Sequence, residues 1–392
     1  MGLLEFIAKE PYYEWRIIMK RLLFTPSFPP SIGGAQTFMM ERVKVSPDNL
    51  TVIAAKCDGY QEFDNQQSFK IVRFDYPWRN PSFAPVRRLM QLYAAHRVLS
   101  EALKKDHYSV IELATPFPGA FVLPKTNRKF RLISFALGDD ILRPISTFYS
   151  KYLFIKTLRN IDHIIAISRF TRDLLLENGC REEQISIINP PIHDRFKNIV
   201  DGTMIRSKFP NADCLLLTVS RLEPKKGIDL TIKAVASLKD KFPGLHYIIV
   251  GNGNRNERLR LESLVRRLCI SDRVHFLGRV DFDELPFIYA ACDIYVMPTR
   301  MDIQKGEVEG YGISFVEASS QCKPVIGPNV GGACDAILDK ITGYCIDPNN
   351  VDELIEKLSN LILDPNLRKK MGIAGREFAI RPTDWSPLLN FK

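Results

Sequence analysis

Short apolar runs alternate with helical segments along almost the whole chain, and no other feature of the sequence constrains the fold as strongly. In the first half the apolar runs span residues 21–24, 50–55, 69–74, 110–113, 131–136 and 163–167. The second half repeats the pattern at residues 214–219, 246–250, 274–277, 294–298 and 324–326. Short strands separated by helices form parallel sheets that are covered on both faces. The sequence therefore predicts an α/β protein with doubly wound parallel sheets.

A polar stretch between the two series of strands divides the chain. A length of 392 residues is large for a single core, so two domains are expected. We predict an N-terminal domain at residues 19–196, a hinge at 197–210 and a C-terminal domain at 211–375. Residues 376–392 form a tail. Residues 1–18 form an N-terminal extension that packs on its own domain, stays flexible, or contacts a membrane or a partner.

The composition is that of an ordinary globular protein, with 45% hydrophobic and 25% charged residues. The net charge of +9 is uneven, because residues 1–195 hold 27 of the 54 Lys and Arg residues but 20 of the 45 acidic ones. A basic N-terminal half suits an anionic membrane or an acidic acceptor. The eight cysteines lack C-x-x-C spacing and indicate reduced thiols, and no apolar run is long enough to cross a membrane. We expect a cytoplasmic protein, or one peripheral at the cytoplasmic face of the membrane.

Two carboxylates, Glu309 and Glu317, flank a turn that we expect to open a helix near Ser314. The turn consists of Gly310, Tyr311, Gly312 and Ile313. Its amides can point at an anion, because glycine permits close backbone approach and a helix N-terminus carries partial positive charge. The two carboxylates can accept hydrogen bonds from hydroxyl groups on either side of that anion. A nucleotide sugar, with a diphosphate between two sugars, fits this layout.

The segment 309–317 resembles the E-x7-E motif of the GT4 family of retaining GT-B glycosyltransferases. Residues 220–227, which follow a predicted strand, resemble the S-R-L-x-x-x-K-G motif of the same family. The resemblance implies that Arg221 and Lys226 bind the diphosphate, for which a planar fork of donors and a mobile point charge are complementary. Lys225, between them, is expected to face solvent.

Two further loops resemble parts of the same family. Residues 25–35, with the pair Gly33 and Gly34, resemble its glycine-rich loop, which faces the donor phosphate across the cleft. Arg279 lies in a segment that resembles the loop whose backbone reads the base. The tail around residues 384–385 resembles the family's last helix, which crosses back to the first domain.

The chain departs from the family at one position. Relatives commonly carry a His-Gly pair after the strand that corresponds to 131–136, and this chain has Leu137 where the His would stand. The neighbouring Asp139 or Asp140 could supply a polar contact instead. A separate Asp-x-Asp pair, Asp281 and Asp283, resembles the metal motif of another glycosyltransferase fold, but Asp283 most simply caps the helix that follows. No metal site is therefore predicted.

The resemblance implies a GT-B fold, in which two Rossmann-like domains face a cleft. It also implies retaining transfer of a hexose to a hydroxyl group of a glycan or lipid-linked glycan. The form of the segment 308–313 favours mannose from GDP-mannose, with UDP-sugars next. The implied catalytic residues are Glu309, Arg221 and Lys226, and the implied donor-binding residues are Gly33, Gly34, Gly310, Tyr311, Gly312, Ile313, Glu317 and Arg279.

Three alternatives remain. Leu137 leaves open a catalytically weak binding partner in polysaccharide assembly. A nucleotide-sugar epimerase or a phosphorylase can share the fold, although no separate phosphate or pyridoxal site is evident in the sequence. Nucleic-acid binding would explain the charge but not the motifs, so no nucleic-acid partner is expected.

Overall fold

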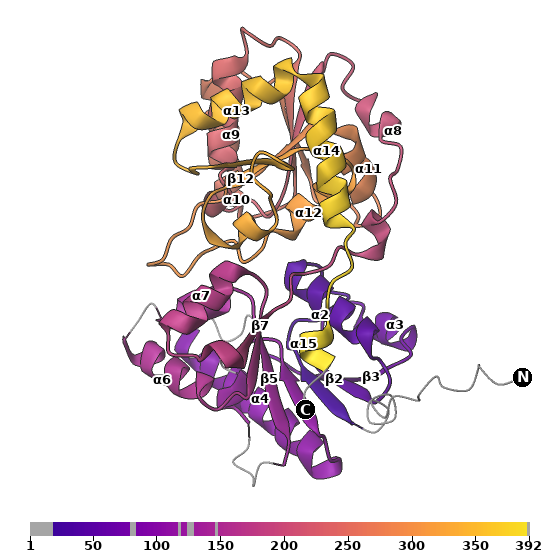
Figure 1. The fold of residues 1–392 in the computed structure, drawn as a ribbon, viewed down its shortest axis with the longest axis vertical. Helices are drawn as coiled ribbons and strands as arrows, with labels where there is room; N and C mark the ends of the chain where they lie inside the picture. Colours follow the sequence, from indigo (N-terminus) through magenta and orange to yellow (C-terminus); the bar gives the residue numbers. More distant parts are fainter. Residues whose placement is uncertain (1–18, 79–83, 117–118, 124–128, 146–147, 390–392) are drawn as a thin grey trace, which may run out of the picture.

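The computed structural model describes residues 19–78, 84–116, 119–123, 129–145 and 148–389, so the predicted extension 1–18 lies outside the described residues. Two parallel sheets dominate the fold and lie one above the other in Figure 1. In spatial order the first sheet contains β3 (Lys70–Phe74), β2 (Leu50–Ala55), β1 (Arg21–Phe24), β4 (Val110–Leu113), β5 (Arg131–Ala136), β6 (His163–Ala166) and β7 (Ile185–Ile187). The second contains β10 (Val274–Gly278), β9 (Leu245–Val250), β8 (Cys214–Val219), β11 (Ile294–Val296), β12 (Val325–Pro328) and β13 (Gly343–Ile346).

Helices cover both faces of each sheet. Around the first sheet lie α2 (Gly34–Val45), α3 (Tyr60–Asn65), α4 (Ala84–Lys105), α5 (Asp139–Ile145), α6 (Phe148–Leu158) and α7 (Arg169–Glu177). With the second sheet are α8 (Thr203–Arg206), α9 (Ile228–Leu238), α10 (Arg255–Arg267), α11 (Leu285–Ala291), α12 (Ile313–Ser320), α13 (Val351–Leu363) and α14 (Pro365–Ala379). In each sheet the first three strands are added toward one edge, and the chain then returns to the other side of the first strand and continues toward the opposite edge. Doubly wound nucleotide-binding folds have the same change in strand order. The predicted fold class is confirmed.

The strands are apolar throughout because both of their faces are buried. Leu22 and Leu23 are neighbours on β1 and fully buried, yet they belong to different apolar clusters. This follows from the strand geometry, in which successive side chains point to opposite faces of the sheet. One buried charge interrupts the first sheet: Glu112 on β4 accepts hydrogen bonds from Arg21 at 2.8 Å and from Arg42 at 2.5 Å. Two cationic partners compensate the cost of burying that carboxylate.

The chain crosses between the domains twice. The predicted hinge, 197–210, contains α8 and is held against the second sheet, since Gln321 donates to the Phe196 and Asn198 carbonyls and Arg206 pairs with Asp293. This segment is therefore an ordered part of the second domain and not a loose linker.

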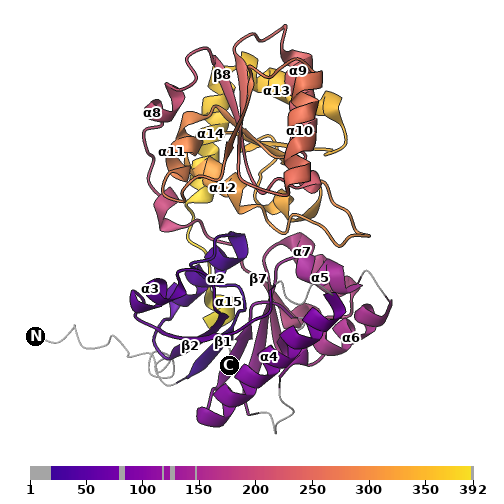
Figure 2. The ribbon, with the colours of Figure 1, turned by 180° about the vertical axis from the view of Figure 1, so that it is seen from behind.

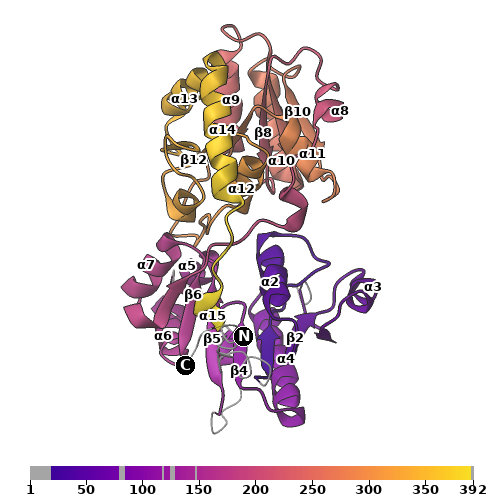
Figure 3. The same ribbon diagram turned by 45° about the vertical axis from the view of Figure 1, so that its right-hand side comes forward.

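The second crossing brings the tail back to the first domain. Figure 3 shows the chain running from α14 down to the short helix α15 (Ser386–Leu389), which lies against the first domain. There the Leu388 carbonyl accepts a hydrogen bond from Arg21 at 3.0 Å, and the Trp385 ring stacks on Phe38. No helix in the described part of the chain is both long and apolar enough to cross a bilayer.

Candidate active site

A cavity of about 840 Å³ lies between the two domains. It is lined by loops that follow β1, β5 and β6 on one side and β8 and β11 on the other, which is where open parallel sheets bind ligands. Charged side chains of both signs reach it, namely Arg88, Asp139, Asp140, Arg143, Arg221, Lys225, Lys226 and Glu309. The remaining wall is largely apolar and includes Phe38, Tyr76, Leu92, Leu137, Pro144, Ile167, Val308, Tyr311 and Ile313.

The turn 310–313, whose amides were predicted to bind an anion and which we call the anion cradle, forms one wall of this cavity. Residues 310–313 all line it, and α12 begins at Ile313. The residue that precedes the helix is Gly312, with φ of +83°, a conformation that glycine adopts without strain. The helix therefore starts just before Ser314, which is not its N-cap. The Glu309 carbonyl accepts a hydrogen bond from Gly332 at 2.8 Å and thereby fixes the start of the turn.

Two of the three predicted catalytic residues contact each other. Lys226 ends the short 3₁₀ helix η4 (Pro224–Lys226) after β8, and its Nζ lies 2.6 Å from Oε2 of Glu309. Both side chains are largely enclosed, with 13% and 16% of their surface exposed. Partial burial strengthens such a charge-assisted hydrogen bond. The S-R-L-x-x-x-K-G and E-x7-E segments therefore meet at one point of the cavity wall.

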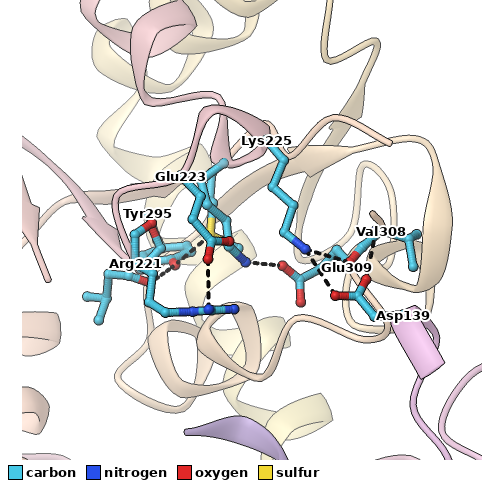
Figure 4. A network of polar contacts seen from close by, with 11 residues as sticks. Asp139, Arg221, Glu223, Lys225, Tyr295, Val308 and Glu309 are labelled. Carbon is cyan, nitrogen blue, oxygen red and sulfur yellow. Dashed lines mark hydrogen bonds and ion pairs between the residues drawn. The ribbon is translucent and has the colours of Figure 1, made fainter. Parts of the chain in front are cut away.

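Arg221, the third predicted catalytic residue, is far more exposed. It lines the cavity, but 73% of its side chain is accessible and its guanidinium pairs with Glu223 at 2.7 Å. Figure 4 shows Arg221 and Glu223 paired in the same region as Glu309. An exposed Arg is free to change rotamer, so Arg221 can reach a ligand in the cavity without loss of a buried contact.

Lys225 does not face solvent, contrary to the sequence prediction. Its side chain is only 7% exposed and reaches across the cleft to Asp139, with Nζ 3.3 Å from Oδ2. Asp139 also accepts a hydrogen bond from the Val308 amide at 2.9 Å (Figure 4). Sequence reasoning missed this contact because its partners lie in different domains, 86 positions apart, and no local pattern connects them.

The glycine-rich loop lies opposite the cradle. Gly34 is the first residue of α2 and lines the cavity, and a Cβ built on it would lie 3.6 Å from Ile313. Gly33 precedes the helix and does not itself line the cavity. The loop thus lies close to the turn 310–313, and its contact with a donor phosphate stays a prediction.

Glu317 and Arg279 lie outside the cavity wall. Glu317 is a buried residue of α12, and the Tyr289 hydroxyl donates to its Oε2 at 2.7 Å. Burial raises the pKa of Glu317 to about 7. Arg279 is exposed and directly follows β10, so it lies at the carboxyl ends of the strands of the second sheet. Their roles toward a nucleotide remain predictions.

The region that departs from the family pattern borders the cavity. Leu137 lines it with its side chain, and its amide donates to Oδ1 of Asp140 at 2.8 Å. Burial raises the pKa of Asp140 to about 7, with a smaller contribution from the neighbouring Asp139 carboxylate. Both aspartates of this segment are thus near the cavity, where the sequence alone left their roles open.

The expectation that Asp283 caps a helix is wrong. Helix α11 is preceded by Glu284, without a side-chain cap, and Asp283 instead pairs with Arg195. The Asp281 carbonyl accepts a hydrogen bond from the Glu284 amide. Asp283 is therefore an ordinary surface ion-pair partner.

Two family models match this chain. The model described as Glycosyltransferase Family 4 matches residues 32–196, and the model described as Glycosyl transferases group 1 matches residues 203–378. Each covers one domain, and together they span most of the chain. The chain is a GT4-type glycosyltransferase.

Curated relatives of this glycosyltransferase match it over nearly their full length. One is the GDP-mannose-dependent alpha-(1-6)-phosphatidylinositol monomannoside mannosyltransferase of Mycolicibacterium smegmatis, 28% identical over 381 residues, covering 93% of this chain and 94% of the relative. Another is the GDP-mannose-dependent monoacylated alpha-(1-6)-phosphatidylinositol monomannoside mannosyltransferase of Corynebacterium glutamicum, 26% identical over 388 residues with coverage of 93% and 94%. Among solved structures, HepE of Anabaena in complex with UDP superposes with a TM-score of 0.75 at 23% identity, covering 92% of this chain and 94% of that chain. This last likeness shows the GT-B fold.

Proposed function

We propose that this glycosyltransferase transfers a hexose, with mannose favoured, from a nucleotide diphosphate sugar to a hydroxyl group of a glycan or lipid-linked glycan, with retention of configuration. The observation that carries the proposal is the contact between Lys226 and Glu309 at the mouth of the anion cradle. A cation for the diphosphate and a carboxylate for the sugar hydroxyls lie side by side there, as a nucleotide sugar requires. The names of the full-length relatives favour GDP-mannose as the donor, and UDP-sugars come next.

Catalysis in this proposal rests on stabilising the leaving diphosphate. As the bond from sugar to phosphate breaks, negative charge grows on the phosphate oxygens. Lys226, Arg221 and the amides of the turn 310–313 are the groups that would stabilise this charge. Lys226 would exchange Glu309 for a phosphate oxygen, which leaves the carboxylate to accept a sugar hydroxyl.

Retention follows if the acceptor attacks the face from which the diphosphate leaves. The leaving phosphate oxygen would then take the proton of the acceptor hydroxyl, and no separate protein base is required. With cationic side chains and a helix terminus at the diphosphate, transfer is expected to need no metal ion. Transfer that stops on addition of EDTA and resumes with Mn²⁺ or Mg²⁺ would contradict this part.

The acceptor end of the cavity opens beside α4 and α6, which lie next to each other on one face of the first domain in Figure 2. Exposed apolar side chains, Leu89, Tyr93 and Tyr152, alternate there with the exposed bases Arg97 and Lys151. This combination suits a lipid-linked acceptor at an anionic membrane surface. Sedimentation with vesicles of phosphatidylglycerol, compared with phosphatidylcholine, tests the membrane contact.

The decisive experiment incubates the purified protein with GDP-mannose, UDP-glucose or UDP-N-acetylglucosamine and a lipid-extract acceptor. An α-linked product from an α-linked donor, identified by proton NMR, would support the proposal, and a β-linked product would contradict retention. The Glu309→Gln variant should lose turnover and keep its affinity for the nucleoside diphosphate. Donor incubated without acceptor separates the alternatives, since an epimerase would alter the sugar and a phosphorylase would need inorganic phosphate. A protein that binds donors but never turns them over would be a binding partner only.

A further inference from the structure

Asp139, in the N-terminal domain, contacts two groups of the C-terminal domain. In the proposed function the N-terminal domain is the acceptor domain and the C-terminal domain is the donor domain. It is the first residue of α5, and its Oδ2 lies 3.3 Å from Nζ of Lys225. Its Oδ1 accepts a hydrogen bond from the Val308 amide at 2.9 Å. Arg143, on the same helix, pairs with the carboxylate at 3.2 Å. The Asp139 carboxylate of one domain therefore binds both a side chain and a backbone amide of the other domain.

The backbones of the two domains touch beside this carboxylate. A Cβ built on Gly310 would lie 1.9 Å from the Leu137 carbonyl oxygen, and one built on Gly138 would lie 3.1 Å from Cα of Gly310. Such an approach is open only to glycine on both sides. The two loops thus meet in a close backbone contact, and Asp139 joins the domains beside it.

The amide that Asp139 binds belongs to the residue directly before Glu309. On its other side, the Glu309 carbonyl is held by the Gly332 amide at 2.8 Å. Glu309 is therefore fixed from the donor domain through Gly332 and from the acceptor domain through Asp139. Lys225 precedes Lys226, so the same carboxylate also restrains the segment that carries the predicted phosphate ligand.

The interaction of Asp139 with Lys225 differs from the more exposed ion pairs that join the domains, such as Arg169 with Asp335 and Arg195 with Asp283. Arg169 pairs with Asp335 at 2.7 Å, but 67% of the Arg169 side chain is exposed and neither residue lines the cavity. The Asp335 side chain is 8% exposed, but its carboxylate also accepts a hydrogen bond from the Arg169 amide, which a substitution of the Arg169 side chain leaves in place. Lys225 is 7% exposed, so removal of its counter-ion would leave an almost buried charge with the Val308 carbonyl, 3.5 Å away, as an acceptor but no carboxylate. The domain contact at Asp139 is therefore the one that a substitution would disturb most strongly.

We propose that Asp139 is a positioning residue for the transfer reaction: through the Val308 amide and Lys225 it sets the placement of Glu309 and Lys226 when the domains are closed. The inference rests on the proposed function, because the changes in kcat that test it can be measured only if the protein transfers a sugar. It assigns to the acceptor domain a direct part in building the donor-sugar site.

The test compares Asp139→Asn, Asp139→Ala and Lys225→Met with a matched control, Arg169→Gln, which removes a different interdomain ion pair. Asp139→Asn keeps an acceptor for the Val308 amide and loses the charge, so kcat should fall about tenfold with little change in KM for the donor. Asp139→Ala loses both contacts and should lower kcat about a hundredfold. Arg169→Gln should keep kcat within about twofold of the wild type.

A double-mutant cycle isolates the pair. If Asp139 and Lys225 act together, the double variant Asp139→Asn with Lys225→Met should be no slower than the single variants. Small-angle scattering should show a more open average arrangement for Asp139→Ala than for the wild type. Wild-type kcat in Asp139→Asn with an intact fold, or equal losses in Asp139→Asn and Arg169→Gln, would overturn the inference. Absence of transfer by the wild-type protein with every donor would instead refute the proposed function, and the scattering comparison would still test the domain contact.

Discussion

Lys226 and Glu309 neutralise each other in the cavity wall, whereas Arg221 is exposed. Removal of Lys226 and removal of Arg221 should therefore affect the protein differently. Lys226→Ala removes the cation aimed at the diphosphate and leaves the largely enclosed Glu309 without its partner. Arg221→Ala removes an exposed side chain that pairs with Glu223. In both variants turnover should fall by on the order of a hundredfold, as for loss of one donor aimed at developing charge.

Stability separates the two variants. Lys226→Ala should also lower the melting temperature, because an unpaired carboxylate stays enclosed, whereas Arg221→Ala should not. Steady-state kinetics and thermal unfolding of both proteins measure this difference, and Lys370→Ala, at an exposed position of α14, serves as a control. Near-normal turnover of both variants with intact folds would show that the diphosphate site is elsewhere.

Glu317 links pH to stability. Burial raises its pKa from 4.5 to about 7, so between these values the folded state keeps a proton that the unfolded chain has released. The free energy of unfolding therefore falls as the pH rises through this window and stays lower above it. Glu317→Gln cannot ionise and keeps an acceptor for the Tyr289 hydroxyl, so it should raise the free energy of unfolding at pH 8 by on the order of 3 kcal/mol.

The same Glu317 variant also tests the predicted ribose contact, for which a loss of affinity is expected in place of a gain in stability. If the carboxylate holds the ribose, Glu317→Gln should weaken nucleoside diphosphate binding while it stabilises the protein. Urea unfolding at pH 5 and pH 8 and titration calorimetry measure the two effects, and Glu356→Gln, with an exposed carboxylate, is the control. Unchanged stability at pH 8 would mean that the carboxylate ionises freely, and unchanged affinity would remove Glu317 from the donor site.

At the scale of elements, the start of α12 depends on one backbone conformation. Gly312 has φ of +83°, and a Cβ added there would lie 2.6 Å from the buried Phe315 ring. Gly179, after α7, has nearly the same φ, +87°, but nothing lies within 4 Å of an added Cβ. Gly179→Ala should therefore cost only the conformational strain, about 1 kcal/mol.

Gly312→Ala should cost more than Gly179→Ala and should also weaken donor binding, since the clash with Phe315 displaces the amides of the cradle. Chemical denaturation and nucleotide titration of the two variants form a matched pair. Equal losses of stability, with unchanged nucleotide affinity in both, would mean that the cradle does not depend on the conformation at Gly312.

Much of the element pattern was predictable from the sequence, because fully buried parallel strands are continuous apolar runs. The predicted strands at 21–24, 50–55 and 131–136 have the observed bounds. The prediction failed where tertiary contacts decide the outcome. Lys225 reads as a solvated Lys in its own segment, and only a carboxylate from the other domain buries it. The short strand β13 carries Gly343 and Tyr344 in place of an aliphatic run, so its sequence lacks the signal of a buried strand.

The candidate site also has a part that the sequence predicted and a part that it did not. The two carboxylates around the turn and the cations of residues 221–226 were visible as local motifs, and their contact follows from the parallel sheet, which brings the carboxyl ends of β8 and β11 together. The contribution of the first domain was not visible. It depends on how two separately folded units meet, and no periodicity within either unit encodes the pairing of Asp139 with Val308.

At the scale of the whole molecule, the tail is a second clamp between the domains. After α14 the chain returns to the first domain, where Trp385 stacks on Phe38 with ring centroids 5.7 Å apart. Phe38 is almost fully buried and also lines the cavity, so the tail packs directly behind the cavity wall. Arg21, which helps to compensate the buried Glu112, donates to the Leu388 carbonyl. The tail thus completes the core of a domain that lies far away in the sequence.

Trp385→Ala should therefore destabilise the first domain and not the second. The loss of a partly buried aromatic contact is expected to cost about 2 kcal/mol, and the released Phe38 ring should raise KM for the acceptor more than KM for the donor. Calorimetric unfolding, with Ile373→Ala on the exposed face of α14 as the control, measures the first effect, and steady-state kinetics measures the second. A variant that loses stability but keeps both KM values would limit the tail to a structural role. A variant with wild-type unfolding would show that the stacked ring contributes nothing to the first domain, which its position against Phe38 and the core behind it argues against.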